Sequence, residues 1–370
     1  MLIGVPKEIK DNEFRVALTP GGAHALVRDG HAVRIESGAG LGSNIPDSAY
    51  EAAGARIVPS AQAAWDNELV LKVKEPIESE YGYFREGLVL FTFLHLAAEE
   101  ALTRALLSAG VTGIAYETVQ LSGGVLPLLA PMSEVAGRLA PIVGANAMLK
   151  PAGGPGLLVP GVPGTHPAEI VIIGAGVAGT NAMNVAVGLG AAVTVLDTNL
   201  FRLREIDDVW GRSVTTIASN AYEIELALMS ADLVIGSVLI PGAKAPKLVT
   251  NAMVAKMRPG SVLVDIAIDQ GGCFEDSHAT THSDPTYRVH GSMFYCVANM
   301  PGAVPVTSTY ALTNATLPYA RALAAKGWRE ALRADPALAL GLNTHAGALT
   351  NDAVAAAHGL AAEPVAVALG

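Results

Sequence analysis

A glycine-rich turn inside a long uncharged stretch constrains this chain more than any other feature of its sequence. Residues 170–196 contain no charged side chain, and Gly174, Gly176 and Gly179 stand near their start in the spacing G-x-G-x-x-G. A membrane span would also be long and uncharged, but several glycines and two asparagines interrupt this stretch. A strand, a tight turn, a helix and a second strand inside an α/β core account for it better.

The spacing of this motif predicts a dinucleotide site. Gly174 permits a tight turn, Gly176 lets the backbone approach a pyrophosphate, and Gly179 lets the helix pack on the strand. Asp197 lies about 20 residues after Gly176, at the end of the second strand. There it would bind the adenosine ribose hydroxyls and repel a 2′-phosphate. We therefore expect NAD rather than NADP, with nearby Arg202 weakening that exclusion only slightly.

Length, charge and cysteine content narrow the class of protein. The 370 residues suggest two domains. The net charge of −10 and the lack of long basic runs argue against a nucleic-acid or anionic-membrane partner. Cys273 and Cys296 form no metal-binding or redox motif, and the N-terminus has no signal-peptide pattern. These features favour a cytoplasmic protein with reduced thiols.

Strand and helix patterns alternate along most of the chain, which predicts parallel sheets with helices on both faces. In the first region the expected strands are residues 3–5, 32–35, 69–73, 88–94 and 111–116. In the second region they are residues 169–173, 193–197, 213–218, 232–237, 261–266 and 293–297. Six strands are what two mononucleotide-binding halves require, in the spatial order 3-2-1-4-5-6.

The expected fold is therefore α/β, with two Rossmann-like doubly wound parallel-sheet domains. After Pro305 the Ala/Leu-rich sequence predicts helices to the end of the chain, and we expect these to return to the first region. The catalytic domain would then be discontinuous, made of residues 1–130 plus 306–370. Residues 131–305 would form the NAD-binding domain.

Four polar residues are candidates for chemistry. Lys74 and His95 each follow an apolar strand, and ligands of open α/β sheets collect at strand carboxyl ends. Histidine titrates near neutral pH and can exchange a proton with a substrate oxygen. Arg15 lies in a polar stretch, and Asp269 follows the apolar strand of SVLVDIAIDQGG. Taken singly, each also fits a solvated, capping or hydrogen-bonded structural residue.

Taken together, these residues resemble the L-alanine dehydrogenase family. Its relatives include the NAD-binding subunit of proton-translocating transhydrogenase and, more distantly, saccharopine dehydrogenase. The matching stretches are GVPKEIKDNEFRVALTP, LVLKVKEP, LFTFLHLA, AYETVQ, PLLAPMSEVAGRLA, the glycine-rich motif, PGAKAPKLV, VLVDIAIDQGGCFE, YCVANMPGAVP and TSTYALTNATLPY.

The resemblance implies oxidative deamination of L-alanine by NAD to pyruvate and ammonium, through an iminium and a carbinolamine, in a cleft between the two domains. Arg15 would bind the substrate carboxylate, and Lys74 would contact the carboxylate and the carbonyl oxygen. His95 would be the general acid/base, and Asp269 would activate water or ammonia.

The resemblance also implies the cofactor contacts. They would be Ser133 near the nicotinamide, Val177 and Ala178 at the phosphates, Asp197 and Arg202 at the adenosine end, and Ser219 at the adenine. Residues after three further strands complete the set: Val238, Leu239, Ile266, Ala267, Ile268, Asp269, Val297, Ala298, Asn299 and Met300.

Two departures and three alternatives qualify this picture. His278 stands where some members have a cofactor-binding arginine, and Ala322 and Lys326 stand where some have a magnesium-binding Glu/His pair, so no metal is expected. The family resemblance implies a homo-oligomer, a hexamer or a smaller assembly.

The alternatives to an alanine dehydrogenase are a transhydrogenase-type NAD(H)-binding subunit without amino-acid chemistry, a saccharopine dehydrogenase-like enzyme, and a non-catalytic NAD-binding or structural protein. Lys74 and His95 argue against the first.

Overall fold

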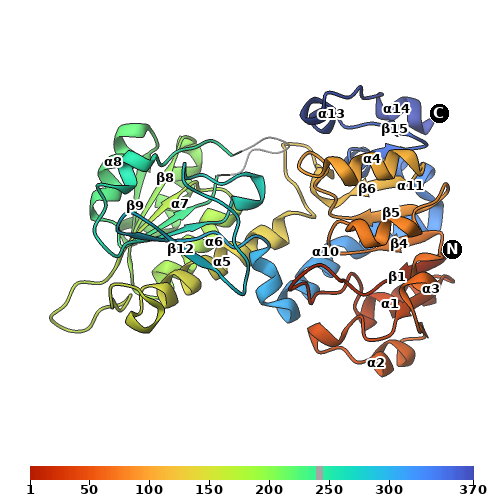
Figure 1. The fold of residues 1–370 in the computed structure, drawn as a ribbon, viewed down its shortest axis with the longest axis horizontal. Helices are drawn as coiled ribbons and strands as arrows, with labels where there is room; N and C mark the ends of the chain where they lie inside the picture. Colours follow the sequence, from red (N-terminus) through yellow and green to blue (C-terminus); the bar gives the residue numbers. More distant parts are fainter. Residues whose placement is uncertain (239–244) are drawn as a thin grey trace. The chain divides into compact units, whose positions relative to one another are not determined.

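The chain forms two compact units in a computed structural model that describes residues 1–238 and 245–370 (Figure 1). The first unit combines residues 1–132 with residues 304–370, and the second is the continuous segment 133–303. Leu239, expected at the cofactor site, lies outside the described residues.

The sheet of the first unit is doubly wound. Its strands are β1 (Leu2–Val5), β2 (Ala32–Glu36), β3 (Arg56–Val58), β4 (Leu69–Leu71), β5 (Val89–Thr92), β6 (Thr112–Ala115), β14 (Leu342–His345) and β15 (Ala348–Leu349). They are ordered β15-β14-β6-β5-β4-β1-β2-β3. The six strands β1 to β6 are parallel to one another. Their spatial order is β3-β2-β1-β4-β5-β6, the 3-2-1-4-5-6 order of a mononucleotide-binding fold.

The expectation of helices to the end of the chain is wrong. The β14–β15 hairpin extends the sheet of the first unit, and β14 pairs antiparallel with β6. Its turn places Ala346 and Gly347 at φ 47° and 85°. Alanine rarely adopts this left-handed backbone, so the sequence shows no typical hairpin signal.

Helices cover the sheet of the first unit. They are α1 (Pro20–Arg28), α2 (Asp47–Ala52), α3 (Ala61–Trp65), α4 (Glu100–Ser108), α10 (Pro305–Lys326), α11 (Trp328–Ala334), α12 (Pro336–Ala339), α13 (Asp352–His358) and α14 (Val365–Leu369). Thr19 caps α1 by accepting a hydrogen bond from the Gly22 N–H, with Pro20 as the first helical residue. Apolar side chains of α3, α4 and α13 pack with those of β4 and β5 in one buried cluster.

The second unit repeats the doubly wound plan. Its strands are β7 (Glu169–Ile173), β8 (Ala192–Asp197), β9 (Val214–Ala218), β10 (Leu233–Gly236), β11 (Val262–Asp265), β12 (Thr286–Val289) and β13 (Ser292–Tyr295). The order β12-β13-β11-β10-β7-β8-β9 contains the six expected strands in the expected sequence 3-2-1-4-5-6. Only the antiparallel edge strand β12 was not expected.

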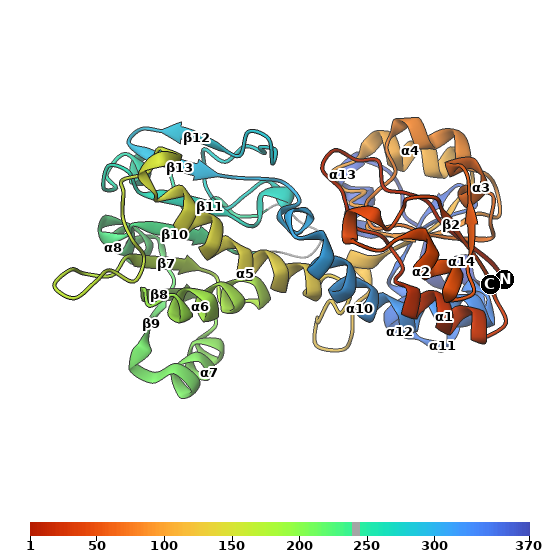
Figure 2. The ribbon, with the colours of Figure 1, turned by 90° about the horizontal axis from the view of Figure 1, so that it is seen from below.

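Both faces of this second sheet are buried. Helices α5 (Ala130–Ala147), α6 (Val177–Gly188) and α7 (Leu200–Trp210) pack on one face, and α8 (Ala221–Ser230) and α9 (Asn251–Val254) pack on the other. Figure 2 shows α5 and α6 side by side along the sheet. Burial on two faces explains the long uncharged stretch. Among the described residues no helix is long and apolar enough to cross a membrane.

The strand order fixes where each unit can bind a ligand. In each sheet the first strand lies between the second and the fourth, so chain connections run in opposite directions from that point. A crevice opens there at the carboxyl ends of the strands. In the first unit this point lies between β1 and β4, and in the second it lies between β7 and β10.

Candidate active site

The glycine-rich turn has the geometry that its sequence predicts. Gly174 has φ 101°, a backbone conformation that favours glycine. A Cβ on Gly179 would lie 1.8 Å from the Gly174 carbonyl oxygen, so any side chain there would push α6 away from the turn. A Cβ on Gly176 would meet no heavy atom within 4 Å, which leaves the backbone at the start of α6 open. This surface fits a pyrophosphate on free helix N–H groups.

Asp197 and Arg202 hold the middle of this turn. Asp197 Oδ2 accepts a hydrogen bond of 2.6 Å from the Ala175 N–H, and Arg202 Nε donates one of 2.8 Å to the Ala175 carbonyl oxygen. Arg202 also donates to the Thr180 hydroxyl at 2.9 Å and pairs with Glu205. Asp197 and Arg202, both expected at the adenosine end, therefore also fix the glycine-rich turn.

In the first unit, Lys74 and His95 follow neighbouring parallel strands at the same edge of the sheet. Each lies three residues past the end of its strand, β4 for Lys74 and β5 for His95. The next strand, β6, is followed by Glu117. Carboxyl ends of parallel strands meet at one edge, so this edge gathers a cation, an imidazole and a carboxylate.

Lys74 lies in a buried cluster of charges. Its Nζ is 3.3 Å from Glu75 Oε2, and the two side chains are 8% and 5% exposed. Glu75 also pairs with Lys10. Burial raises the pKa of Glu75, but the charges of Lys74, His95 and Lys10 outweigh burial and lower that pKa to about 2. Glu75 thus stays ionised and balances the buried ammonium group of Lys74.

This lowered pKa predicts a loss of stability in acid. Because the pKa of Glu75 is about 2 in the folded protein, against 4.5 ordinarily, the carboxylate stabilises the fold above pH 4.5. Its contribution, on the order of 3 kcal/mol, disappears as the pH falls towards 2.

In urea unfolding, Glu75→Gln should be less stable than the parent at pH 7, with the difference shrinking below pH 4.5. Glu86→Gln, at an exposed site, is the control. A difference as large at pH 3 as at pH 7 would contradict the assignment.

A second buried ionic group is centred on Lys72, two residues before Lys74. Lys72 Nζ is 2.9 Å from both Glu8 Oε2 and Glu80 Oε1, and all three side chains are at most 4% exposed. Glu8 Oε1 accepts the Val73 N–H at 2.6 Å. Removing one member of such a group would leave an uncompensated buried charge. The group therefore fixes the backbone from which Lys74 projects.

His95 adopts an unusual backbone conformation that Glu117 holds in place. Its φ is 49°, in the left-handed region that non-glycine residues rarely enter. The Glu117 carboxylate accepts the N–H of His95 at 2.6 Å and that of Leu94 at 3.2 Å. The His95 ring stacks on Phe93 with an interplanar angle of 7°. The imidazole is half-buried and has a fixed direction.

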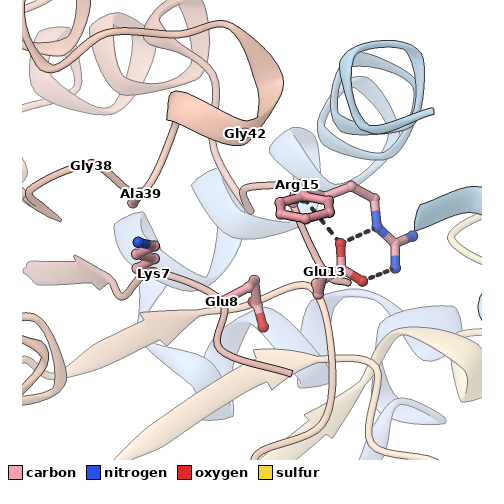
Figure 3. A pocket seen from close by; sticks show the side chains of 8 residues that line it. Lys7, Glu8, Glu13, Arg15, Gly38, Ala39 and Gly42 are labelled. Atoms are coloured by element: carbon pink, nitrogen blue, oxygen red, sulfur yellow. Dashed lines mark hydrogen bonds and ion pairs between the residues drawn. The ribbon is translucent and has the colours of Figure 1, made fainter. Parts of the chain in front are cut away.

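Arg15 is 2% exposed and carries a bidentate ion pair with Glu13. Its Nε and Nη2 donate to the Glu13 carboxylate at 2.7 and 2.5 Å, as Figure 3 shows. Nη1 is 3.0 Å from the sulfur of Met132. Both charged side chains line a small pocket in the first unit, together with Lys7, Glu8, Phe14, Gly38, Ala39 and Gly42.

Asp269 belongs to the second unit, on the loop after β11. It is exposed, follows the end of β11 by four residues, and accepts the Asn299 N–H at 3.3 Å. Asn299 itself has φ 63°. The loop therefore joins two of the segments expected at the cofactor, residues 266–269 and 297–300.

The other expected cofactor residues within the described ranges lie at the carboxyl ends of strands in the second unit or on its helices. Ser219 follows β9 and donates its N–H to the Asp197 carbonyl, and Val238 follows β10. Ser133 lies in α5. His278 is exposed, and its ring stacks on Tyr287 with centroids 3.7 Å apart. Among the described residues, no group of three or more His, Cys, Asp or Glu side chains could hold a metal ion.

Sequence reasoning missed the carboxylates that hold the expected groups: Glu13 at Arg15, Glu75 at Lys74, and Glu117 at His95. Glu117 could have been predicted from the sequence, because it follows an expected strand just as Lys74 and His95 do. Glu13 and Glu75 lie beside their partners in the sequence, where a charged neighbour usually indicates only a solvated surface.

Two doubly wound sheets, with a glycine-rich turn at one switch point, define the class of dinucleotide-binding α/β proteins. Residues 4–136 match the family described as Alanine dehydrogenase/PNT, N-terminal domain, and residues 140–352 match Alanine dehydrogenase/PNT, C-terminal domain. The chain belongs to the alanine dehydrogenase/PNT family.

Individual relatives agree over nearly the full chain. Alanine dehydrogenase of Mycobacterium tuberculosis (strain ATCC 25618 / H37Rv) is 60% identical over 356 residues, 96% of each chain. That of Staphylococcus haemolyticus (strain JCSC1435) is 60% identical over 361 residues, 97% of each. A solved L-alanine dehydrogenase structure has a TM-score of 0.93 at 51% identity, covering 97% of this chain and 99% of its own. The transhydrogenase of Sinorhizobium meliloti has a TM-score of 0.79 at 29% identity, covering 95% and 100%.

Proposed function

We propose that this chain catalyses the reversible, NAD-dependent oxidative deamination of L-alanine to pyruvate and ammonium. The observation that carries the proposal is its 60% identity to curated alanine dehydrogenases over 96% of both chains. The presence of Lys74, His95 and Arg15 in the first unit supports it, because a dehydrogenase of amino acids needs a carboxylate anchor and a proton-transfer group. The lower identity to transhydrogenase, 29%, makes a purely NAD(H)-binding role the weaker alternative.

Arg15 and Lys74 anchor the substrate in this proposal. Nη1 of Arg15 faces a thioether sulfur, a weak acceptor, and a substrate carboxylate in its place would accept a much stronger, charge-assisted hydrogen bond. Glu13 holds the guanidinium plane while this happens. Lys74 places a second positive charge for the carboxylate and the carbonyl oxygen, and ionised Glu75 limits the cost of burying that charge.

His95 and Asp269 move protons. The imidazole of His95 exchanges a proton with the oxygen that becomes the pyruvate carbonyl, because histidine is the side chain most often used for general acid/base catalysis. Asp269 is exposed on its loop, so it can take a proton from the water that adds to the iminium. Its carboxylate accepts a hydrogen bond from the Asn299 N–H, which directs the side chain from the loop.

The second unit fits NAD. The open Gly176 backbone, the N-terminus of α6 and the carboxylate of Asp197 would hold the pyrophosphate and the adenosine ribose. Bound NAD⁺ would supply the acceptor for the hydride that leaves the alanine Cα. We infer a preference for NAD over NADP because Asp197 would repel a 2′-phosphate and Arg202 pairs with Glu205 and the turn.

The remaining proposals concern the assembly and the compartment. The family resemblance supports a homohexamer, and the mass of the particle in solution tests it. Cys273 and Cys296 are buried free thiols, in keeping with a reducing, cytoplasmic environment.

One assay tests the function. The purified protein with NAD⁺ and L-alanine should form NADH, and pyruvate, ammonium and NADH should give the reverse reaction. NADP⁺ should be a much poorer acceptor than NAD⁺. A protein that binds NADH in a fluorescence titration yet turns over in neither direction would instead be the NAD(H)-binding subunit of the alternative. Activity that required a larger amino acid would point to the saccharopine dehydrogenase-like enzyme.

A further inference from the structure

The loop that carries Asp269 is closed by a buried carboxylate at its base. Asp265, the last residue of β11, is 0% exposed. Its Oδ2 accepts the Ser277 hydroxyl at 2.5 Å and the Cys273 N–H at 2.8 Å. The same oxygen accepts the Phe274 N–H at 3.4 Å, and Oδ1 accepts the Ala267 N–H at 3.1 Å. Four donors from both ends of the loop thus converge on one side chain.

The loop between these donors is tightly built around the carboxylate. Residues Ile268–Gln270 form a single 3-10 turn, and Gly271 and Gly272 follow at φ 91° and 78°. A Cβ on Gly272 would lie 2.5 Å from Asp265 Oδ2 and 2.7 Å from Ser277 Cβ. Only glycine therefore lets the chain pass this close to Asp265, and the position of Asp269 follows from that passage.

A buried carboxylate is costly for stability alone. Burial raises the pKa of Asp265, although Ser277 and the backbone donors act in the opposite direction. An apolar residue at the end of a buried strand would avoid that cost. A carboxylate that gathers four donors fixes a single loop conformation, which a site for proton transfer needs.

We propose that Asp265 is a positioning residue that acts through Asp269. It touches no substrate and moves no proton. It holds residues 266–274 so that the Asp269 carboxylate keeps its direction and its hydrogen bond from the Asn299 N–H. The inference rests on the proposed role of Asp269 in adding water, and it extends that proposal to the residue that sets the geometry.

A double-mutant cycle between Asp265→Asn and Asp269→Asn tests this on the full-length protein. Asp265→Asn should lower kcat for L-alanine by about 10- to 100-fold. It should also change the pH profile of kcat/KM, because the carboxylate that accepts the proton is then no longer held in the same position. In the Asp269→Asn background the same substitution should have little further effect. Ser277→Ala removes one of the four donors and should show a smaller loss of the same kind, even if Asp265→Asn fails to fold.

The matched control is Ser261→Ala, just before the other end of β11. Ser261 and Ser292 are buried and share a hydrogen bond of 2.9 Å, so this variant loses a buried hydroxyl near the same strand. It should lower the melting temperature but leave kcat and the pH profile unchanged.

The outcomes separate the two proposals. If Asp269→Asn keeps near-parental turnover, the role of Asp269 is wrong and the inference fails with it. If Asp269→Asn is impaired but Asp265→Asn and Ser277→Ala only lower stability, or Asp265→Asn acts additively, then Asp265 is structural and the inference alone is overturned.

Discussion

Replacing His95 by asparagine should lower kcat for L-alanine oxidation by about 10²- to 10⁴-fold, the usual contribution of a general acid/base. Asparagine is the informative substitution because His95 has φ 49° and asparagine tolerates the left-handed region. The Glu117 carboxylate can still accept the backbone N–H groups of residues 94 and 95. The loop should therefore keep its shape and lose only the group that exchanges the proton.

A second histidine provides the control for this experiment. His290 also has a positive φ, 50°, and its exposed side chain lies in the turn between β12 and β13 of the second unit. Steady-state kinetics of His290→Asn should match the parent, and both variants should bind NADH with parental affinity. If His95→Asn keeps kcat within about twofold of His290→Asn, proton exchange by His95 is excluded. His95→Ala would be a poorer test than His95→Asn, because alanine in the left-handed backbone region adds about 1–2 kcal/mol of strain that could itself change the loop.

The sequence was sufficient to predict the parts of the fold that repeat a strong local pattern. The six parallel strands of the second unit and their order followed from buried apolar runs separated by helices. The roles of Gly174 and Gly179 followed from spacing, and the φ of the first and the close packing of the second agree. These features depend on residues close together in the chain, which is why a single sequence carries them.

What the sequence did not predict depends on contacts between distant or atypical residues. The β14–β15 hairpin turns at Ala346, a residue with no preference for that conformation, and its pairing partner β6 lies more than 200 residues earlier. Glu117 acts on a backbone 22 residues away, through a strand register that periodicity cannot supply. The fourfold acceptor at Asp265 was visible only as a charge inside an apolar strand.

The glycine-rich turn offers a second test, because α6 contains two glycines with opposite surroundings. Gly179→Ala would place a methyl group 1.8 Å from the Gly174 carbonyl oxygen and 2.6 Å from Ser237 Oγ. Ser237 Oγ already donates to the Ile173 and Gly174 carbonyls at 3.0 and 2.9 Å, so it cannot move without breaking these bonds. We expect α6 to shift away from the turn, with a loss of about 1–3 kcal/mol in the free energy of unfolding.

The same substitution at Gly188, the last residue of α6, meets no heavy atom within 4 Å. Gly188→Ala should therefore stabilise the protein by about 0.5–1 kcal/mol, through helix propensity alone. Urea unfolding and a fluorescence titration with NADH measure both effects. Gly179→Ala should weaken NADH binding at least tenfold and Gly188→Ala should not change it, because only the first disturbs the N–H groups that would hold the pyrophosphate. Parental NADH affinity in Gly179→Ala would show that close packing of α6 on the turn is not required for dinucleotide binding.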